Sequence, residues 1–229
     1  MHTRPNRTGR SPLLFLDLET GGLDAVQHEI LELGAVLTSP DGSAELGGID
    51  ARVRPLRPEL VTPFAQEING YSAAGWTDAR PLAEVLADLV GLAEGATLVG
   101  HNICFDWGFI LTALREHGLA WSGNGRYLDT MALAPWAGPG LANRQLLTMA
   151  AYLGIPTEDA HRALVDAAMC RSVFLCLAPR RPGRLERVLP EGVVRRTPIP
   201  RTSKHCLPRW RWRVRAIMRL VRGVGAGRT

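Results

Sequence analysis

The sequence lacks long hydrophobic runs, patterned cysteines and, almost entirely, lysine. A membrane-spanning helix needs about 20 consecutive apolar residues, and polar or charged residues interrupt every apolar run well before that length, so we expect no membrane span. The 4 cysteines show neither C-x-x-C pairs nor the spacing of zinc ligands, which argues against a structural zinc site. Only Lys204 among the 27 basic residues is lysine, a bias more typical of genomic base composition than of a particular function.

Length and charge predict one domain of catalytic size with an appendage. The chain has 229 residues, and single domains commonly run to roughly 100–200 residues. Residues 1–178 carry 12 arginines against 20 acidic residues, a net charge of −8, whereas residues 179–229 carry 15 basic against 2 acidic residues, a net charge of +13. We therefore expect a loose lead-in over residues 1–11, an acidic domain over 12–178 and a basic tail over 179–229.

The N-terminus has some features of a secretory signal. Arg4, Arg7 and Arg10 precede the apolar run from Leu13 to Leu16, but an aspartate at position 17 ends that run far too early for a signal peptide. We therefore expect a cytoplasmic protein.

Alternation and turn signals predict an antiparallel meander followed by alternating helices and strands. Three strands are expected first, and the turn Ser39-Pro40-Asp41-Gly42-Ser43 joins the second to the third. The predicted fold class is α/β, with a mixed five-stranded sheet that contains three meander strands and is flanked by helices. The strands are expected over 13–18, 29–38, 45–53, 96–100 and 127–129, and the helices over 64–70, 82–92, 104–117, 143–153 and 161–177, with 130–141 as a loop.

Two carboxylates end the first predicted strand, in Leu16-Asp17-Leu18-Glu19, just before two glycines. Because side chains two residues apart in a strand point to the same face, Asp17 and Glu19 lie together. Adjacent carboxylates repel each other, and a site that keeps both ionised usually supplies a cation between them. A strand that merely ends in solvated acids before a Gly-Gly turn is the alternative, and partners elsewhere in the chain must decide.

Two later blocks supply such partners, namely His101-Asn102-x-x-Phe105-Asp106 and His161-Arg162-Ala163-Leu164-x-Asp166. Together with Asp17-x-Glu19 they have the order and context of the three motifs of the DEDDh 3′–5′ exonucleases. Over roughly residues 12–178 the chain resembles this family, which includes the proofreading subunit of bacterial DNA polymerase III, RNase T and oligoribonuclease. A sister subfamily has tyrosine four residues before the last aspartate, whereas this chain has histidine five residues before Asp166, which fits the DEDDh subfamily better. The resemblance implies a ribonuclease H-like fold.

The resemblance also implies a site with two divalent cations, Mg²⁺ or Mn²⁺, which prefer carboxylate oxygens. Asp17 is expected to bridge both ions, and Glu19 and Asp166 to complete the site beside the attacking water. Asp106 is expected to hold the second ion, largely through water. His161 is expected to be the general base, because an imidazole can take up a proton near neutral pH. Taken singly, the histidine and the two helix acids are more typical of surface or capping residues, and their shared context favours the site.

Family resemblance further assigns residues to the terminal nucleotides of the substrate. Asn69 stands where relatives often have histidine, and its amide can still form hydrogen bonds. Gly21 replaces a second threonine that often follows the Glu-Thr pair, a departure that touches no expected metal ligand. The expected substrate-binding residues are Thr20, Leu23, Asn69, Asn102 and Phe105.

We therefore expect a metal-dependent 3′–5′ exonuclease that releases nucleoside 5′-monophosphates from single-stranded or frayed nucleic-acid ends, with DNA favoured over RNA. An RNA-trimming exoribonuclease similar to oligoribonuclease or RNase T stays open, because the same carboxylates serve both substrates. A non-catalytic subunit that recruits a polymerase or repair complex also stays open, although the five intact catalytic positions argue against it.

The basic tail has an amphipathic pattern at its end. Trp210, Val214, Ile217, Val221 and Val224 lie on one side of a helical wheel, and arginines lie on the other. Such a segment could bind single-stranded nucleic acid, lie on an anionic membrane surface or dock with a polymerase or repair partner. A disordered basic extension is an equal alternative.

Overall fold

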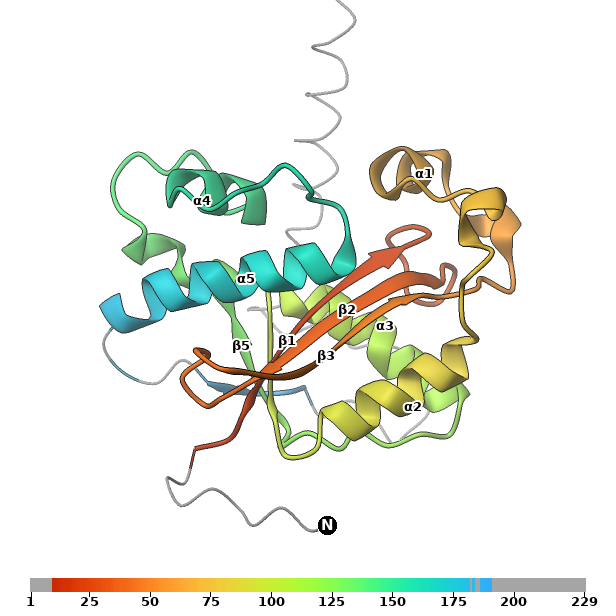
Figure 1. Cartoon of the computed structure of the whole chain (residues 1–229), viewed down its shortest axis with the longest axis horizontal. Helices are drawn as coiled ribbons and strands as arrows, with labels where there is room; N and C mark the ends of the chain where they lie inside the picture. The colour runs from red at the N-terminus through yellow and green to blue at the C-terminus, as the bar shows by residue number, and fades with distance from the viewer. Residues whose placement is uncertain (1–9, 182, 184–185, 191–229) are drawn as a thin grey trace, which may run out of the picture. The chain divides into compact units, whose positions relative to one another are not determined.

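The computed structural model describes residues 10–181, 183 and 186–190. Within that part of the chain, helices flank a mixed sheet on both faces (Figure 1). The strands are β1 (Leu13–Thr20), β2 (Ile30–Thr38), β3 (Glu45–Arg52), β4 (Thr97–Gly100), β5 (Arg126–Asp129) and β6 (Arg187–Val188), and the α-helices are α1 (Pro63–Asn69), α2 (Leu82–Leu92), α3 (Ile103–Glu116), α4 (Leu146–Tyr152) and α5 (Ala163–Leu177).

The sheet has the strand order β3-β2-β1-β4-β5-β6. β1 and β3 both pair antiparallel with β2, whereas β4 pairs parallel with β1 and with β5. The predicted α/β class and the three-stranded meander are thereby confirmed.

The described sheet has six strands, and the prediction of five was wrong. The sixth strand, β6, pairs antiparallel with β5, so that Val188 lies opposite Arg126 and Arg187 opposite Tyr127. A two-residue strand has no alternation for a sequence pattern to detect. It also lies beyond residue 178, in the segment assigned to the tail by charge. The amphipathic pattern predicted at 210–224 lies outside the described residues.

The helix predicted over 161–177 begins two residues later than expected, at Ala163. His161 has a φ of 70°, which is left-handed backbone and cannot continue an α-helix. The helix predicted over 143–153 likewise begins only at Leu146. The stretch predicted as a loop over 130–141 contains a 3₁₀-helix, Thr130–Trp136.

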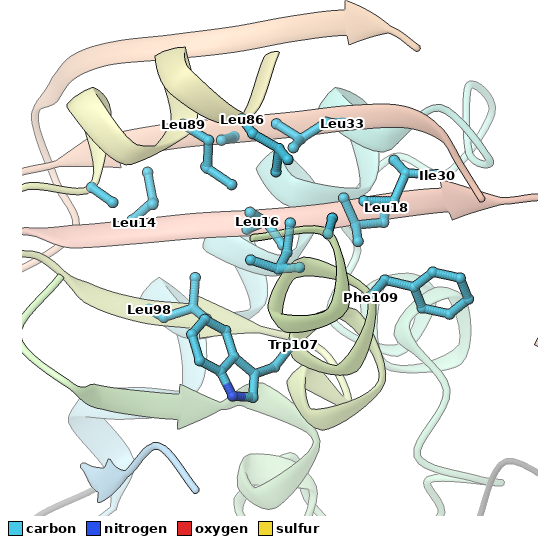
Figure 2. Close-up of a cluster of buried hydrophobic side chains, with 14 of the residues drawn as sticks. Leu14, Leu16, Leu18, Ile30, Leu33, Leu86, Leu89, Leu98, Trp107 and Phe109 are labelled. Carbon is cyan, nitrogen blue, oxygen red and sulfur yellow. The ribbon is translucent and has the colours of Figure 1, made fainter. Parts of the chain in front are cut away.

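Alternation along β1 directs its side chains to two different helical layers. The even-numbered residues from Leu14 to Leu18 pack against α2 and α3 in one core cluster, which Figure 2 shows together with side chains of both helices. Leu13 and Phe15 face the opposite side, where α4 and α5 cover the sheet. The ring of Phe15 meets the ring of Phe174 in α5 at a centroid distance of 5.5 Å. The two halves of the core therefore anchor α3 and α5 on opposite faces of β1.

No helix of the described residues is both long enough and apolar enough to cross a membrane.

Candidate active site

β1 carries two of the predicted site residues beyond the end of its parallel neighbour. Pairing with β4 stops at Phe15, whereas β1 continues to Thr20. Asp17 and Glu19 share the face of Phe15, the face covered by α5. Asp17 exposes only 4% of its surface, although it is an acid.

Asp106 is brought to β1 by the turn from β4 into α3. Its Oδ1 atom accepts a hydrogen bond of 3.2 Å from the backbone N–H of Leu18, the residue between the two acids of β1. A first-turn carboxylate of α3 therefore bonds a backbone donor of β1 that β4 is too short to pair. Its negative charge is also favoured at a helix N-terminus.

The remaining two predicted residues come from the start of α5. Asp166 lies in the first turn of the helix and is 5% exposed. One ligand atom each from Glu19, His161 and Asp166 lies within 4.8 Å of the other two. Residues far apart in the sequence thus meet in one group that can hold a metal ion.

The donor set fits a divalent cation. Carboxylate oxygens are the ligands that hard cations prefer. Ionised carboxylates that leave water also need compensating positive charge or hydrogen-bond donors. Asp17 lies in β1, Asp106 accepts from Leu18 of that strand and Asp166 is grouped with Glu19 of the same strand, and all three aspartates are buried.

α5 can reach this position because Gly34 of β2 lacks a side chain. Gly34 lies opposite Asp17 in the sheet. A Cβ atom added at Gly34 would lie 2.1 Å from the backbone C of Ala163 and 2.1 Å from the backbone N of Leu164. The first turn of α5 therefore rests directly on the backbone of β2, which sets the position of Asp166 relative to Asp17.

Gly34→Ala is expected to lower both stability and turnover. The clash involves backbone on both sides, so α5 must move away from the sheet, and overpacking of this kind costs about 1–3 kcal/mol. Because misplacing a catalytic group by about 1 Å can cost about 100-fold in rate, we expect turnover to fall by about 10- to 100-fold. Thermal melting and oligonucleotide digestion measure the two effects. Gly91→Ala in α2 is the matched control, because a Cβ there meets nothing within 4 Å. Equal activity in the two variants would contradict the positioning role.

Two non-glycine residues among those described have left-handed backbone, and both precede an acid-bearing helix. They are Asn102, at a φ of 64°, and His161, at a φ of 70°. Such conformations cost free energy and persist where surrounding contacts hold them. For Asn102 the contact is Asp129, whose Oδ1 accepts hydrogen bonds from the N–H groups of Asn102 (2.9 Å) and Met131 (3.0 Å).

Asp129 is partly buried at the end of β5. Burial raises its pKa above the ordinary value, and the two backbone N–H donors oppose that shift only in part. Ionisation of this carboxyl therefore costs more in the folded chain than in the unfolded chain. The contribution of the neutral carboxyl to stability is present at low pH and is lost as the pH rises through the raised pKa.

Asp129→Asn is expected to be at least as stable as the natural protein at neutral pH. The amide oxygen can still accept both hydrogen bonds, and the buried charge is removed. The difference in unfolding free energy between Asp129→Asn and the natural protein should shrink as the pH falls, because the carboxyl of Asp129 then becomes neutral too. Asp129→Ala leaves both N–H groups without their acceptor and should be less stable by about 1–3 kcal/mol for each. Urea unfolding at several pH values measures these differences. A pH-independent difference for Asp129→Asn would contradict the role of burial.

The predicted substrate-binding residues come from the end of β1, the loop after it, α1 and the start of α3. Asn69 of α1 is buried, and its Nδ2 donates to the backbone oxygen of Thr20 at 3.3 Å. Its Oδ1 accepts from the N–H of Tyr71, so the side chain has a structural use beside the predicted one. Phe105 contacts Phe109 within α3, with ring centroids 5.1 Å apart. Three further residues complete the set, namely Thr20 at the end of β1, Asn102 at the start of α3 and Leu23, which is exposed in the β1–β2 loop.

Sequence reasoning missed three residues that lie next to the site residues or support their elements, namely Glu32, which is opposite Glu19 in the sheet, Gly34 and Asp129. A signal existed for Glu32, because it is an acid within the otherwise apolar run Ile30-Leu31-Glu32-Leu33. A signal also existed for Asp129, because it is an acid at the end of a short predicted strand. Gly34 gave no comparable signal.

Comparison with known proteins places the chain in a family. A family model described as exonuclease matches residues 14–174, a span that contains all three sequence blocks. The chain belongs to the exonuclease family. The DNA polymerase III subunit epsilon of Treponema pallidum is 30% identical over 165 residues, which cover 69% of this chain and 72% of that protein. The DNA polymerase III PolC-type of Thermotoga maritima is 32% identical over 176 residues, which cover 73% of this chain and 12% of that protein.

The fold of this chain also resembles that of solved exonuclease structures. Exonuclease I of E. coli, in a complex with single-stranded DNA, has a TM-score of 0.67 and 18% identity, over 76% of this chain and 41% of that chain. At this identity the likeness shows the fold. The predicted resemblance to the DEDDh 3′–5′ exonucleases and the ribonuclease H-like fold are thereby confirmed. The chain spans little more than a tenth of the PolC-type relatives that it matches.

Proposed function

We propose that this chain is a metal-dependent 3′–5′ exonuclease that releases nucleoside 5′-monophosphates from single-stranded or frayed DNA ends. The observation that carries the proposal is the convergence of Glu19, His161 and Asp166, whose ligand atoms lie within 4.8 Å of one another. Membership of the exonuclease family supports the same reaction.

Four acids, Asp17, Glu19, Asp106 and Asp166, would hold two divalent cations, Mg²⁺ or Mn²⁺. Glu19 and Asp166 would complete the site on the side of His161, and Asp106 would serve the second ion. When bound, such ions shield the charge on the non-bridging phosphate oxygens, favour ionisation of a water molecule and stabilise the leaving 3′-oxygen.

The side chains of this chain supply the proton transfer and the orientation. His161, with a nitrogen close to the carboxylates of Glu19 and Asp166, accepts the proton of the attacking water. Thr20, Leu23, Asn69, Asn102 and Phe105 surround the end of the substrate.

DNA is favoured over RNA because the polymerase III relatives are named for DNA synthesis and the solved relative is a complex with single-stranded DNA. Because those relatives are named DNA polymerase III, the partner that we propose is a polymerase complex. We also propose a cytoplasmic location.

Matched oligomers test the proposal. We expect a 5′-labelled single-stranded DNA to shorten one nucleotide at a time with Mg²⁺, to yield 5′-monophosphates and to be protected by a chelator. An RNA oligomer of the same sequence should be digested more slowly. Faster digestion of RNA would favour the trimming exoribonuclease, and no digestion of either would favour the recruitment subunit.

A further inference from the structure

We propose that Glu32 is a positioning residue that holds His161 in its working conformation. The inference rests on the proposed function, because it assigns Glu32 a role through the general base. Glu32 lies in β2 directly opposite Glu19 of β1 and points to the face covered by α5. It is 2% exposed, although it is an acid.

The carboxylate of Glu32 is bonded to the two residues that follow His161. Its Oε2 atom accepts from Nε of Arg162 at 3.3 Å and from the backbone N–H of Ala163 at 3.4 Å. Ala163 is the first residue of α5, so one oxygen bonds both the helix start and the side chain before it. The distances are long for hydrogen bonds, but the charge of the carboxylate strengthens both contacts.

The other oxygen of Glu32 is anchored away from the site. Its Oε1 atom accepts from Nε of Arg52 at 3.5 Å. The guanidinium of Arg52 also donates to the backbone oxygen of Gly75 at 2.9 Å and lies 4.7 Å from the ring centroid of Trp76. Glu32 therefore connects a fixed arginine on one side to the start of α5 on the other.

This arrangement explains how His161 keeps a left-handed backbone. Its φ of 70° is unfavourable for a residue with a side chain. The residues after it are fixed by Glu32, and α5 rests on Gly34 two residues further along β2. Without Glu32, the peptide around His161 is expected to relax and the ring to leave the position in which it meets Glu19 and Asp166.

Variants of Glu32 are expected to fold. Arg162 is half-exposed and can be solvated, and Arg52 keeps its contacts with Gly75 and Trp76. Glu32→Gln conserves the size of the buried side chain but loses its charge. Glu32→Ala removes the acceptor entirely and is the second variant, with a loss expected to be at least as large.

A double-mutant cycle in the full chain tests the inference. For Glu32→Gln we expect kcat on a DNA oligomer to fall by about 10- to 100-fold, the usual effect of removing a residue that orients a functional one, with KM changed less than twofold. In the His161→Ala background the same substitution should cause no further loss, because its effect passes through the imidazole. Losses that multiply would overturn the inference and leave the proposed function standing.

Two comparisons separate the possible failures. Full turnover in His161→Ala alone would overturn the proposed base, and the positioning role with it. Glu45→Gln is the matched control, because Glu45 of β3 also pairs with an arginine of α5, Arg171, at 3.5 Å, but away from His161. An equal loss of kcat in Glu45→Gln and Glu32→Gln would show that any link between sheet and helix has this effect, and would also overturn the inference.

Discussion

Asp17→Ala and Asp166→Ala are each expected to abolish hydrolysis while leaving the fold intact. Asp17 lies in β1 and Asp166 in the first turn of α5, and both are buried at the place where the two elements meet. Removing either takes away oxygen ligands that the proposed metal site cannot replace. In the metal-free protein, thermal stability should be unchanged or slightly higher, because one acid fewer relieves repulsion in a crowded anionic site.

Digestion with Mg²⁺ and thermal melting should be measured on the same preparations of these variants. Asp50→Ala is the matched control, since Asp50 is an exposed acid of β3 in the same sheet. We expect the control to keep full activity. Full activity in Asp17→Ala or Asp166→Ala would sink the two-metal assignment, and unfolding of either variant would show that the acid is structural.

His161→Ala is expected to lower turnover by roughly 10²–10⁴-fold, the usual contribution of a positioned general base. Metal affinity should change little, because the carboxylates supply the ligands. His161→Gln should be no more active than the alanine variant, since an amide cannot accept the proton. Steady-state kinetics and calorimetric titration with Mn²⁺ measure the two properties separately.

The calorimetric result decides between two roles for the same ring. A nitrogen of His161 lies within 4.8 Å of carboxylate oxygens of Glu19 and Asp166, which is also compatible with a metal ligand. Weaker Mn²⁺ binding by His161→Ala would make the histidine a ligand and the assignment as base wrong. His117→Ala, at an exposed position after α3, is the control and should match the natural protein in both measurements.

The sequence was sufficient for the parts of the site that depend on local order. Asp17 and Glu19 share a face because side chains alternate along a strand. Asp106 lies in the first turn of the helix that follows β4, so its side chain stays close to the sheet. The meander was predictable for the same reason, since alternation and a strong turn signal are local.

The parts that the sequence did not reveal depend on contacts between distant segments. The missing side chain of Gly34 matters only because Ala163 lies against it. The left-handed backbone of His161 is unfavourable on its own, and nothing local to the residue predicts it. In the sequence, Glu32 only interrupts an apolar strand, and its contact with Arg162 depends on a segment 130 residues away.

Anomalous diffraction from crystals soaked in Mn²⁺ tests the central claim most directly, namely that these carboxylates hold the metal ions of a nuclease. We expect two peaks about 3.5–4 Å apart, one of them bound by both Asp17 and Asp166, and neither bound by His161. Peaks that avoid both aspartates, or ordered carboxylates with no peak beside them, would contradict the account.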